Sequence, residues 1–184
     1  MIPNIIGKNI KIYENFLTSL QVKEFDVLQS EDGTFPWFYS KIISEDDIKE
    51  TDKEFINDQF VHTIYNNFSQ QSHFFNLCRP ILDKLDAKAV WRIKINLTLP
   101  TKEPMPLGTY HNDLTWSGKV NDDAKIAIYY PAENNGKLLV KEDEEEHTIE
   151  NSGNQLIQIP NTYEHLGISN TDGNNRYAVN IVYF

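Results

Sequence analysis

Residues 125–159 read KIAIYYPAENNGKLLVKEDEEEHTIENSGNQLIQI, and this stretch decides the fold. It holds four short runs of β-forming residues, separated by turns predicted at breaks such as Asn134–Gly136 and Asn151–Asn154. Four more runs flank it, and the full set is Ala89–Leu99, Gly108–His111, Lys125–Tyr130, Lys137–Lys141, His147–Glu150, Gln155–Ile159, Tyr163–Ser169 and Arg176–Phe184. Eight short strands in about 95 residues, with no helix among them, predict a β-sandwich or jelly-roll barrel.

The first half of the chain is expected to support this core. Thr18 and Gln21 form a capping-box pattern ahead of an apolar helix. A second helix is expected after Ser69, running through HFFNLC and bent or restarted at Pro80, which cannot donate an intrahelical hydrogen bond. Extended segments are expected at Lys8–Tyr13, Phe35–Ile43 and Phe60–Tyr65.

Length and composition bound the class of protein. At 184 residues the chain is predicted to be one domain, 1–184, in which residues 1–87 support a β core of residues 88–184. A formal charge of -10 disfavours nucleic-acid binding, because it repels phosphates. A single cysteine, Cys78, together with no export signal and no long apolar run, favours a cytoplasmic setting, bacterial or in a phage-infected host, without membrane contact. The oligomeric state is left open.

The segment Tyr110-His111-Asn112-Asp113 ends the second β run and carries a His-x-Asp pair. Side chains at i and i+2 of an extended chain point to the same side, so an imidazole and a carboxylate can bind one ion. The pair alone can arise by composition. His165, in the seventh run, supplies a third ligand if the second and seventh strands are neighbours, and two His and one Asp would then leave three iron positions open.

Arg176 opens the eighth run, 11 residues after His165. A guanidinium aimed into the barrel is suited to bidentate capture of a carboxylate. The alternative is an exposed arginine on an edge strand, which composition alone favours.

The segments YHND, AIYYPAENNGKLLV, YEHLGISN and RYAVNIVYF resemble, in order and spacing, the core of the iron(II)/2-oxoglutarate dioxygenases, particularly their prolyl-hydroxylase-like branch with its phage and bacterial relatives. The resemblance spans residues 92–184 and implies a double-stranded β-helix. One departure is Pro131, which should end the third strand at Tyr130 because proline cannot donate to a ladder.

The resemblance implies specific roles. The metal ligands and catalytic residues would be His111, Asp113 and His165, and the residues that bind 2-oxoglutarate would be Arg176, Tyr130, Asn180 and Asn96. Tyr130 can equally be a core aromatic, and Asn180 can simply satisfy backbone groups. Asn96 lies at the same parity as Arg92 and Lys94 on the first strand of the core, which would place it facing the pocket.

The implied activity is hydroxylation with Fe(II), 2-oxoglutarate and O2, with ascorbate as an optional cofactor. Asp113 favours hydroxylation, because halogenating relatives lack this carboxylate. The expected substrate is a prolyl residue of a protein, or else another peptide or small molecule. Two alternatives remain: a non-catalytic, cupin-like metal-binding protein and a jelly-roll interaction module.

Other conspicuous residues are interpreted as structural. The acidic run Glu142–Glu146 favours a solvated turn. Trp37, Phe38 and Tyr39 are expected in the core rather than at a substrate entrance. His62, His73 and His147 lack a partner at ligand spacing and are expected to be non-catalytic.

Overall fold

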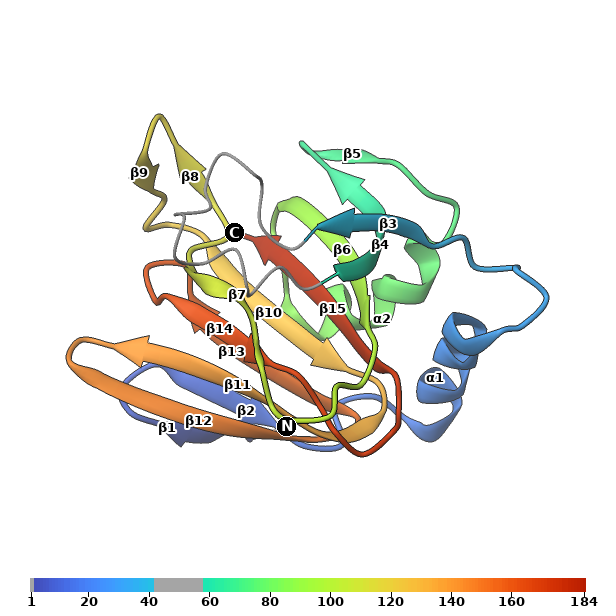
Figure 1. The fold of residues 1–184 in the computed structure, drawn as a ribbon. Helices are drawn as coiled ribbons and strands as arrows, with labels where there is room; N and C mark the ends of the chain where they lie inside the picture. The colour runs from blue at the N-terminus through green and yellow to red at the C-terminus, as the bar shows by residue number, and fades with distance from the viewer. Residues whose placement is uncertain (1, 42–57) are drawn as a thin grey trace.

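The computed structural model describes residues 2–41 and 58–184, which form a mainly β structure with two α-helices (Figure 1). The strands are β1 Asn4–Ile6, β2 Ile10–Tyr13, β3 Phe38–Lys41, β4 Asp58–Asn66, β5 Ser69–Gln70, β6 Val90–Thr98, β7 Pro106–His111, β8 Thr115–Trp116, β9 Lys119–Val120, β10 Lys125–Tyr130, β11 Glu133–Glu142, β12 Glu145–Ser152, β13 Gln155–Pro160, β14 His165–Ile168 and β15 Arg176–Tyr183. The helices are α1 Ser19–Glu24, the 3-10 helix η1 Phe25–Gln29 and α2 Phe75–Leu85.

Two antiparallel sheets form the core. The larger has nine strands in the order β1-β2-β13-β10-β15-β6-β4-β3, with β5 paired to β4, and the smaller has the order β12-β11-β14-β7. Strands β8 and β9 form a separate hairpin. One buried cluster joins the inner faces of the two sheets, with Ile126 and Val182 from the larger and Leu138 and Val140 from the smaller. The predicted double-stranded β-helix, or jelly roll, is confirmed.

All eight predicted β runs are strands, and β10 ends at Tyr130 as Pro131 requires. The turn predicted at Asn134–Gly136 is wrong, because β11 already begins at Glu133 and passes through these residues as a bulge. Asn134 Oδ1 accepts the Gly136 N–H at 3.0 Å, so a local side-chain contact replaces part of the ladder.

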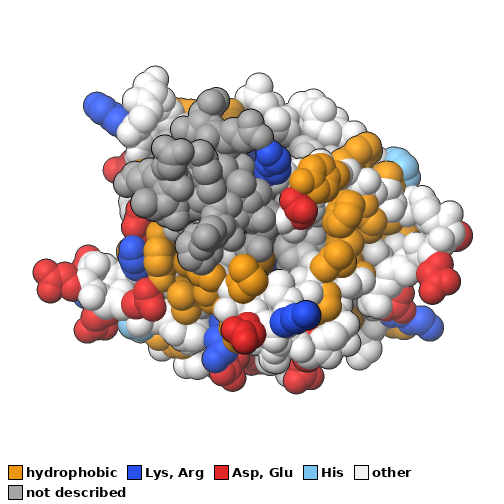
Figure 2. All heavy atoms as spheres, in the orientation of Figure 1, with side chains coloured by type: hydrophobic (Ala, Val, Ile, Leu, Met, Phe, Trp, Pro, Cys, Tyr) orange, Lys and Arg blue, Asp and Glu red, His pale blue; other side chains and the backbone are white. Residues whose placement is uncertain are grey.

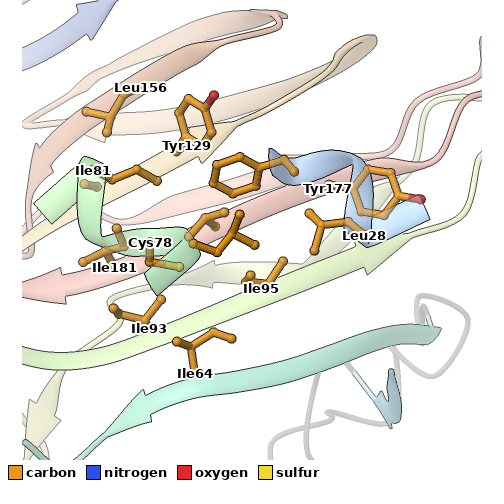
Figure 3. Packing of buried hydrophobic residues seen from close by; sticks show 14 of the residues in the cluster. Leu28, Ile64, Cys78, Ile81, Ile93, Ile95, Tyr129, Leu156, Tyr177 and Ile181 are labelled. Carbon is orange, nitrogen blue, oxygen red and sulfur yellow. The ribbon is translucent and has the colours of Figure 1, made fainter. Parts of the chain in front are cut away.

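Successive side chains on the strands of the larger sheet point alternately into two environments. On β6 the odd residues Ile93, Ile95 and Leu97 are buried beneath the helices, and the even residues face the barrel interior. The same division on β15 places Val179 and Ile181 under the helices. Figure 3 shows this outer cluster, in which Cys78 and Ile81 of α2 lie against Ile93 and Ile181.

The helices cover the outer face of the larger sheet, as expected. Thr18 caps α1, and its capping box with Gln21 is present. Helix α2 continues through Pro80 without a restart, because Leu77, Cys78 and Ile81 hold it against the sheet. Residues 42 and 43 of the predicted extended segment Phe35–Ile43 lie outside the described residues.

No helix within residues 2–41 and 58–184 is long and apolar enough to cross a membrane.

The acidic run lies at the tip of the β11–β12 hairpin, where Figure 2 shows acidic side chains projecting at the left edge. Residues 143–146 are exposed, as predicted. Glu142 is an exception, because its buried carboxylate accepts hydrogen bonds from the backbone N–H groups of Lys8 and Asn9 and from the Tyr163 hydroxyl.

The predicted core position of the aromatic triplet is correct only in part. Trp37 packs against the outer cluster, but Phe38 and Tyr39 are each 59% exposed. They lie on β3, which is the edge strand of the larger sheet and pairs only with β4 among the described residues.

Candidate active site

Strands β7 and β14 bring the three predicted metal ligands together. The two strands are neighbours, which is the condition that this ligand set requires, and their register pairs His111 directly with His165. Asp113 follows β7 by two residues. Ligand atoms of the three side chains all lie within 4.8 Å of one another, close enough to bind one ion.

The histidines are oriented for metal binding through Nε2. His111 Nδ1 lies 2.8 Å from the Thr109 carbonyl oxygen, so it donates its proton there and leaves Nε2 free. His165 is buried, with its Nε2 3.4 Å from Asp113 Oδ2. Desolvation and the neighbouring His165 lower the pKa of His111, which favours the neutral imidazole that a metal requires.

Asp113 is held by two inner-face residues of the larger sheet. Arg92 donates to Oδ1 at 2.5 Å, and Asn180 donates to Oδ2 at 2.8 Å. Arg92 also donates to Asn180 Oδ1 at 3.2 Å, which closes a ring of contacts. Burial alone would raise the pKa of Asp113, but the hydrogen bond and charge of His165, followed by the charge of Arg92, hold this pKa well below its usual value. The carboxylate is therefore ionised and fixed in orientation.

Arg176 and Tyr130 form the other end of the pocket. Arg176 Nη2 donates to the Tyr130 hydroxyl at 2.9 Å, and the guanidinium lies over the ring at 5.0 Å. Burial raises the pKa of Tyr130 despite the opposing charge of Arg176, so its hydroxyl keeps a proton to donate. Arg176 Nε is buried without a hydrogen-bond partner in the described part of the chain. A buried guanidinium with spare donors suits an anionic ligand.

One glycine makes room for this arginine. A Cβ atom on Gly136 would lie 3.1 Å from Arg176 Cδ, which is tighter than an ordinary contact, whereas one on Gly167 would lie in ordinary contact, 3.5 Å from Arg176 Nη2. Gly136, interpreted from sequence as a turn residue, therefore provides a close approach for the arginine.

One cavity of about 150 Å³ contains both ends. Its apolar walls include Leu107, Ile128, Leu138 and Ala178. Its polar walls include every predicted site residue, namely His111, Asp113, Tyr130, His165, Arg176, Asn180 and Asn96. Asn96 Oδ1 is buried and has no partner within residues 2–41 and 58–184. The structure thus brings all seven residues to one pocket.

Sequence reasoning assigned no role to two further cations of this pocket, Arg92 and Lys94. The sequence feature that could have indicated their inward orientation is the alternation on β6, where charged and polar residues interleave with Ile93 and Ile95. The three other histidines lie outside the pocket lining. His62, for example, has both ring nitrogens occupied, by the Pro36 carbonyl and the Ser72 hydroxyl.

Known structures share this arrangement of strands. A 2OG-Fe(II) oxygenase family protein from Burkholderia pseudomallei superposes with a TM-score of 0.65 at 14% identity, covering 95% of this chain and 85% of its own. A prolyl hydroxylase from Trichoplax adhaerens, in complex with a hypoxia-inducible-factor peptide, gives 0.62 at 13% identity, covering 96% and 83%. The fold is that of the 2OG-Fe(II) oxygenases.

Another structural neighbour is an epimerase. This protein, SnoN, solved with Fe3+, alpha-ketoglutarate and nogalamycin RO, superposes with a TM-score of 0.61 at 10% identity, covering 96% of this chain and 78% of its own. No family model and no curated protein matches this sequence. The residues of the pocket, rather than the fold, must therefore carry the argument about function.

Proposed function

We propose that this protein is an iron(II)- and 2-oxoglutarate-dependent oxygenase that hydroxylates its substrate. The observation that carries the proposal is the pairing of His111, Asp113 and His165 with Arg176 in one pocket. Two imidazoles and one carboxylate are the donor set of non-haem iron oxygenases with open coordination positions. The pocket therefore fits Fe(II) as well as an anionic cosubstrate.

Arg176 and Tyr130 would hold the distal carboxylate of 2-oxoglutarate. The guanidinium has unused donors, and the Tyr130 hydroxyl accepts from Arg176 while keeping its own proton. The two groups can thus donate to one carboxylate together. Asn96, with its free Oδ1, and Asn180, which holds Asp113, would complete the polar wall beside the cosubstrate.

Iron, 2-oxoglutarate and O2 together supply an oxidant for a C–H bond and leave succinate and CO2. The chain would contribute ligand geometry, a fixed carboxylate and partly apolar walls. Asp113 occupies the carboxylate-ligand position, which favours hydroxylation over halogenation.

A prolyl residue in a protein or peptide is the first substrate class to test. One structural neighbour is a prolyl hydroxylase solved with a peptide, which supports this choice. Other peptides and small molecules are the next candidates, as the SnoN complex with nogalamycin RO illustrates.

The test is calorimetric titration of 2-oxoglutarate into anaerobic, Fe(II)-loaded protein, comparing the native chain with Arg176→Met. We expect the variant to bind 2-oxoglutarate about tenfold to a hundredfold more weakly, because it loses charged hydrogen bonds. Arg79→Met is the matched control, since Arg79 is an exposed residue of α2 and should leave affinity unchanged. A native chain that binds iron but not 2-oxoglutarate would instead support a non-catalytic metal-binding protein.

A further inference from the structure

We propose that the metal end of the pocket binds an anionic group of the substrate, a carboxylate or a phosphate, through Lys94 with Arg92 beside it. This inference rests on the proposed oxygenase function and adds the chemical class of its substrate.

The pocket concentrates positive charge in an acidic protein. The chain has a formal charge of -10, yet Arg92, Lys94 and Arg176 all line one cavity of about 150 Å³. Two of these cations lie on β6, where alternation directs them inward with Asn96 and Thr98. Their side chains therefore contribute to the site and not to the solvated surface.

The charges of the loaded site do not balance. Iron(II) and the three cations would contribute five positive charges, against one negative charge on Asp113 and two on 2-oxoglutarate. A net charge of about +2 would remain in a confined pocket, where uncompensated charge is costly. An anionic substrate group would neutralise it.

The surplus positive charge lies at the metal end of the pocket and not at the Arg176 end. In the β6–β15 ladder Lys94 pairs with Asn180, and Thr98 pairs with Arg176. Four residues along a strand separate these two levels, a distance of about 13 Å between Cα atoms. Asn180 holds the metal ligand Asp113, so Lys94 lies at the level of the iron. A substrate must approach this level for its C–H bond to react.

Arg92 and Lys94 differ in what they already contact. Arg92 is paired with Asp113. The Lys94 ammonium has no hydrogen bond or ion pair within residues 2–41 and 58–184. Burial and then the charge of Arg92 lower the pKa of Lys94, and together they outweigh the opposing charge of Asp113. Lys94 is therefore the group available to a substrate.

The test uses anaerobic protein loaded with redox-inert Mn(II) and 2-oxoglutarate, titrated calorimetrically with three probes. N-acetyl-L-proline and N-acetyl-L-prolinamide differ in one carboxylate, and inorganic phosphate tests the other anion. We expect at least one anion to bind about tenfold more tightly than the neutral amide, and the tighter anion identifies the source of the charge.

Lys94→Met should abolish this preference and leave 2-oxoglutarate affinity unchanged, and Lys94→Arg should restore the preference. Lys125→Met is the matched control, because Lys125 is an exposed strand lysine. Thermal unfolding of each variant verifies folding. Equal binding of anions and amide by the native protein would overturn the proposal. So would a loss of 2-oxoglutarate affinity in Lys94→Met, because it would assign Lys94 to the cosubstrate.

Failure of the proposed function would be seen separately. If 2-oxoglutarate does not bind the metal-loaded native protein, the oxygenase assignment falls. The anion preference of that metal-loaded protein, with and without Lys94, still decides whether this end of the pocket binds anions.

Discussion

The two faces of the nine-stranded sheet differ in chemical character, although the same strands form both. On the outer face, Ile93 and Ile95 of β6 are fully buried under the helices. On the inner face, the intervening residues Arg92, Lys94 and Asn96 line a polar pocket. The ladder hydrogen bonds serve both faces, so the outer face can supply burial energy and the inner face can hold charges for chemistry. Substitutions at odd positions of β6 should therefore change stability, and substitutions at even positions should change ligand binding. We call this the separation by parity.

The largest effect is expected from His111→Ala. His111 is a proposed iron ligand that lies on the solvent-facing side of the cluster, so its loss should remove iron without unfolding the chain. Bound iron should fall to background, and 2-oxoglutarate turnover should fall by more than about a hundredfold. Metal analysis and succinate release measure the two. His73→Ala, another exposed histidine, should change neither, and retention of iron in His111→Ala would remove His111 from the ligand set.

The next largest effect should come from the outer face. Ile95→Ala should lower the free energy of unfolding by about 2–5 kcal/mol, because it opens a cavity in the outer cluster. Iron and 2-oxoglutarate affinities should stay unchanged while the protein is folded. Urea denaturation and calorimetry measure the two properties.

The neighbouring substitution Asn96→Ala gives the opposite test. Asn96 Oδ1 has no partner within the described residues, so its removal should cost less than about 1 kcal/mol of stability. If Ile95→Ala weakened ligand binding or Asn96→Ala destabilised the fold as strongly, the separation by parity would be wrong.

Two adjacent tyrosines sharpen the comparison on β10. Tyr130 faces Arg176 in the pocket, and Tyr129 faces the outer cluster and donates to Asn154 Oδ1 at 3.1 Å. Tyr130→Phe should weaken 2-oxoglutarate binding by about 1 kcal/mol, and Tyr129→Phe should instead lower stability by about 1 kcal/mol. Calorimetry and denaturation distinguish the outcomes. If Tyr129→Phe alone lost cosubstrate affinity, the proposed assignment of Tyr130 to the pocket and Tyr129 to the outer cluster would be wrong.

The strands could be predicted from the sequence because the residues that form and end them are local signals. Eight runs bounded by turn residues became strands, and proline after Tyr130 ended β10 where expected. The error at Asn134–Gly136 has a tertiary cause, since the same residues that favour a turn also permit a bulge beside Arg176. Sequence alone cannot choose between these outcomes, because the arginine lies some 40 residues away.

The candidate site residues could be predicted from the sequence where the residue type allows few roles. His111, Asp113 and His165 offered few alternatives once their strands were neighbours. Arg92 was not assigned, because an arginine on a strand is usually exposed and its partner Asp113 lies beyond the strand ladder. Glu142 was misjudged for the converse reason, because its partners come from the far N-terminal segment.

The smallest effect is expected from Glu142, which is a buried carboxylate outside the pocket. Asp113 is its counterpart inside the pocket. Burial raises the pKa of Glu142, but hydrogen bonds from Tyr163 and from the backbone of Lys8 and Asn9 outweigh burial and lower it below the ordinary 4.5. A depressed carboxyl pKa stabilises the fold above the ordinary pKa, and this contribution is lost as pH falls through the folded-state pKa.

Glu142→Gln should consequently be less stable than the native chain at neutral pH, and the difference should shrink as pH falls below about 4.5. Urea denaturation across this range measures it, and Glu144→Gln, an exposed neighbour, should track the native chain throughout. Iron binding at neutral pH should be unaffected, because Glu142 does not line the pocket. A stability difference that stays constant with pH would mean that the carboxylate charge contributes nothing, and that only the shape of the side chain matters there.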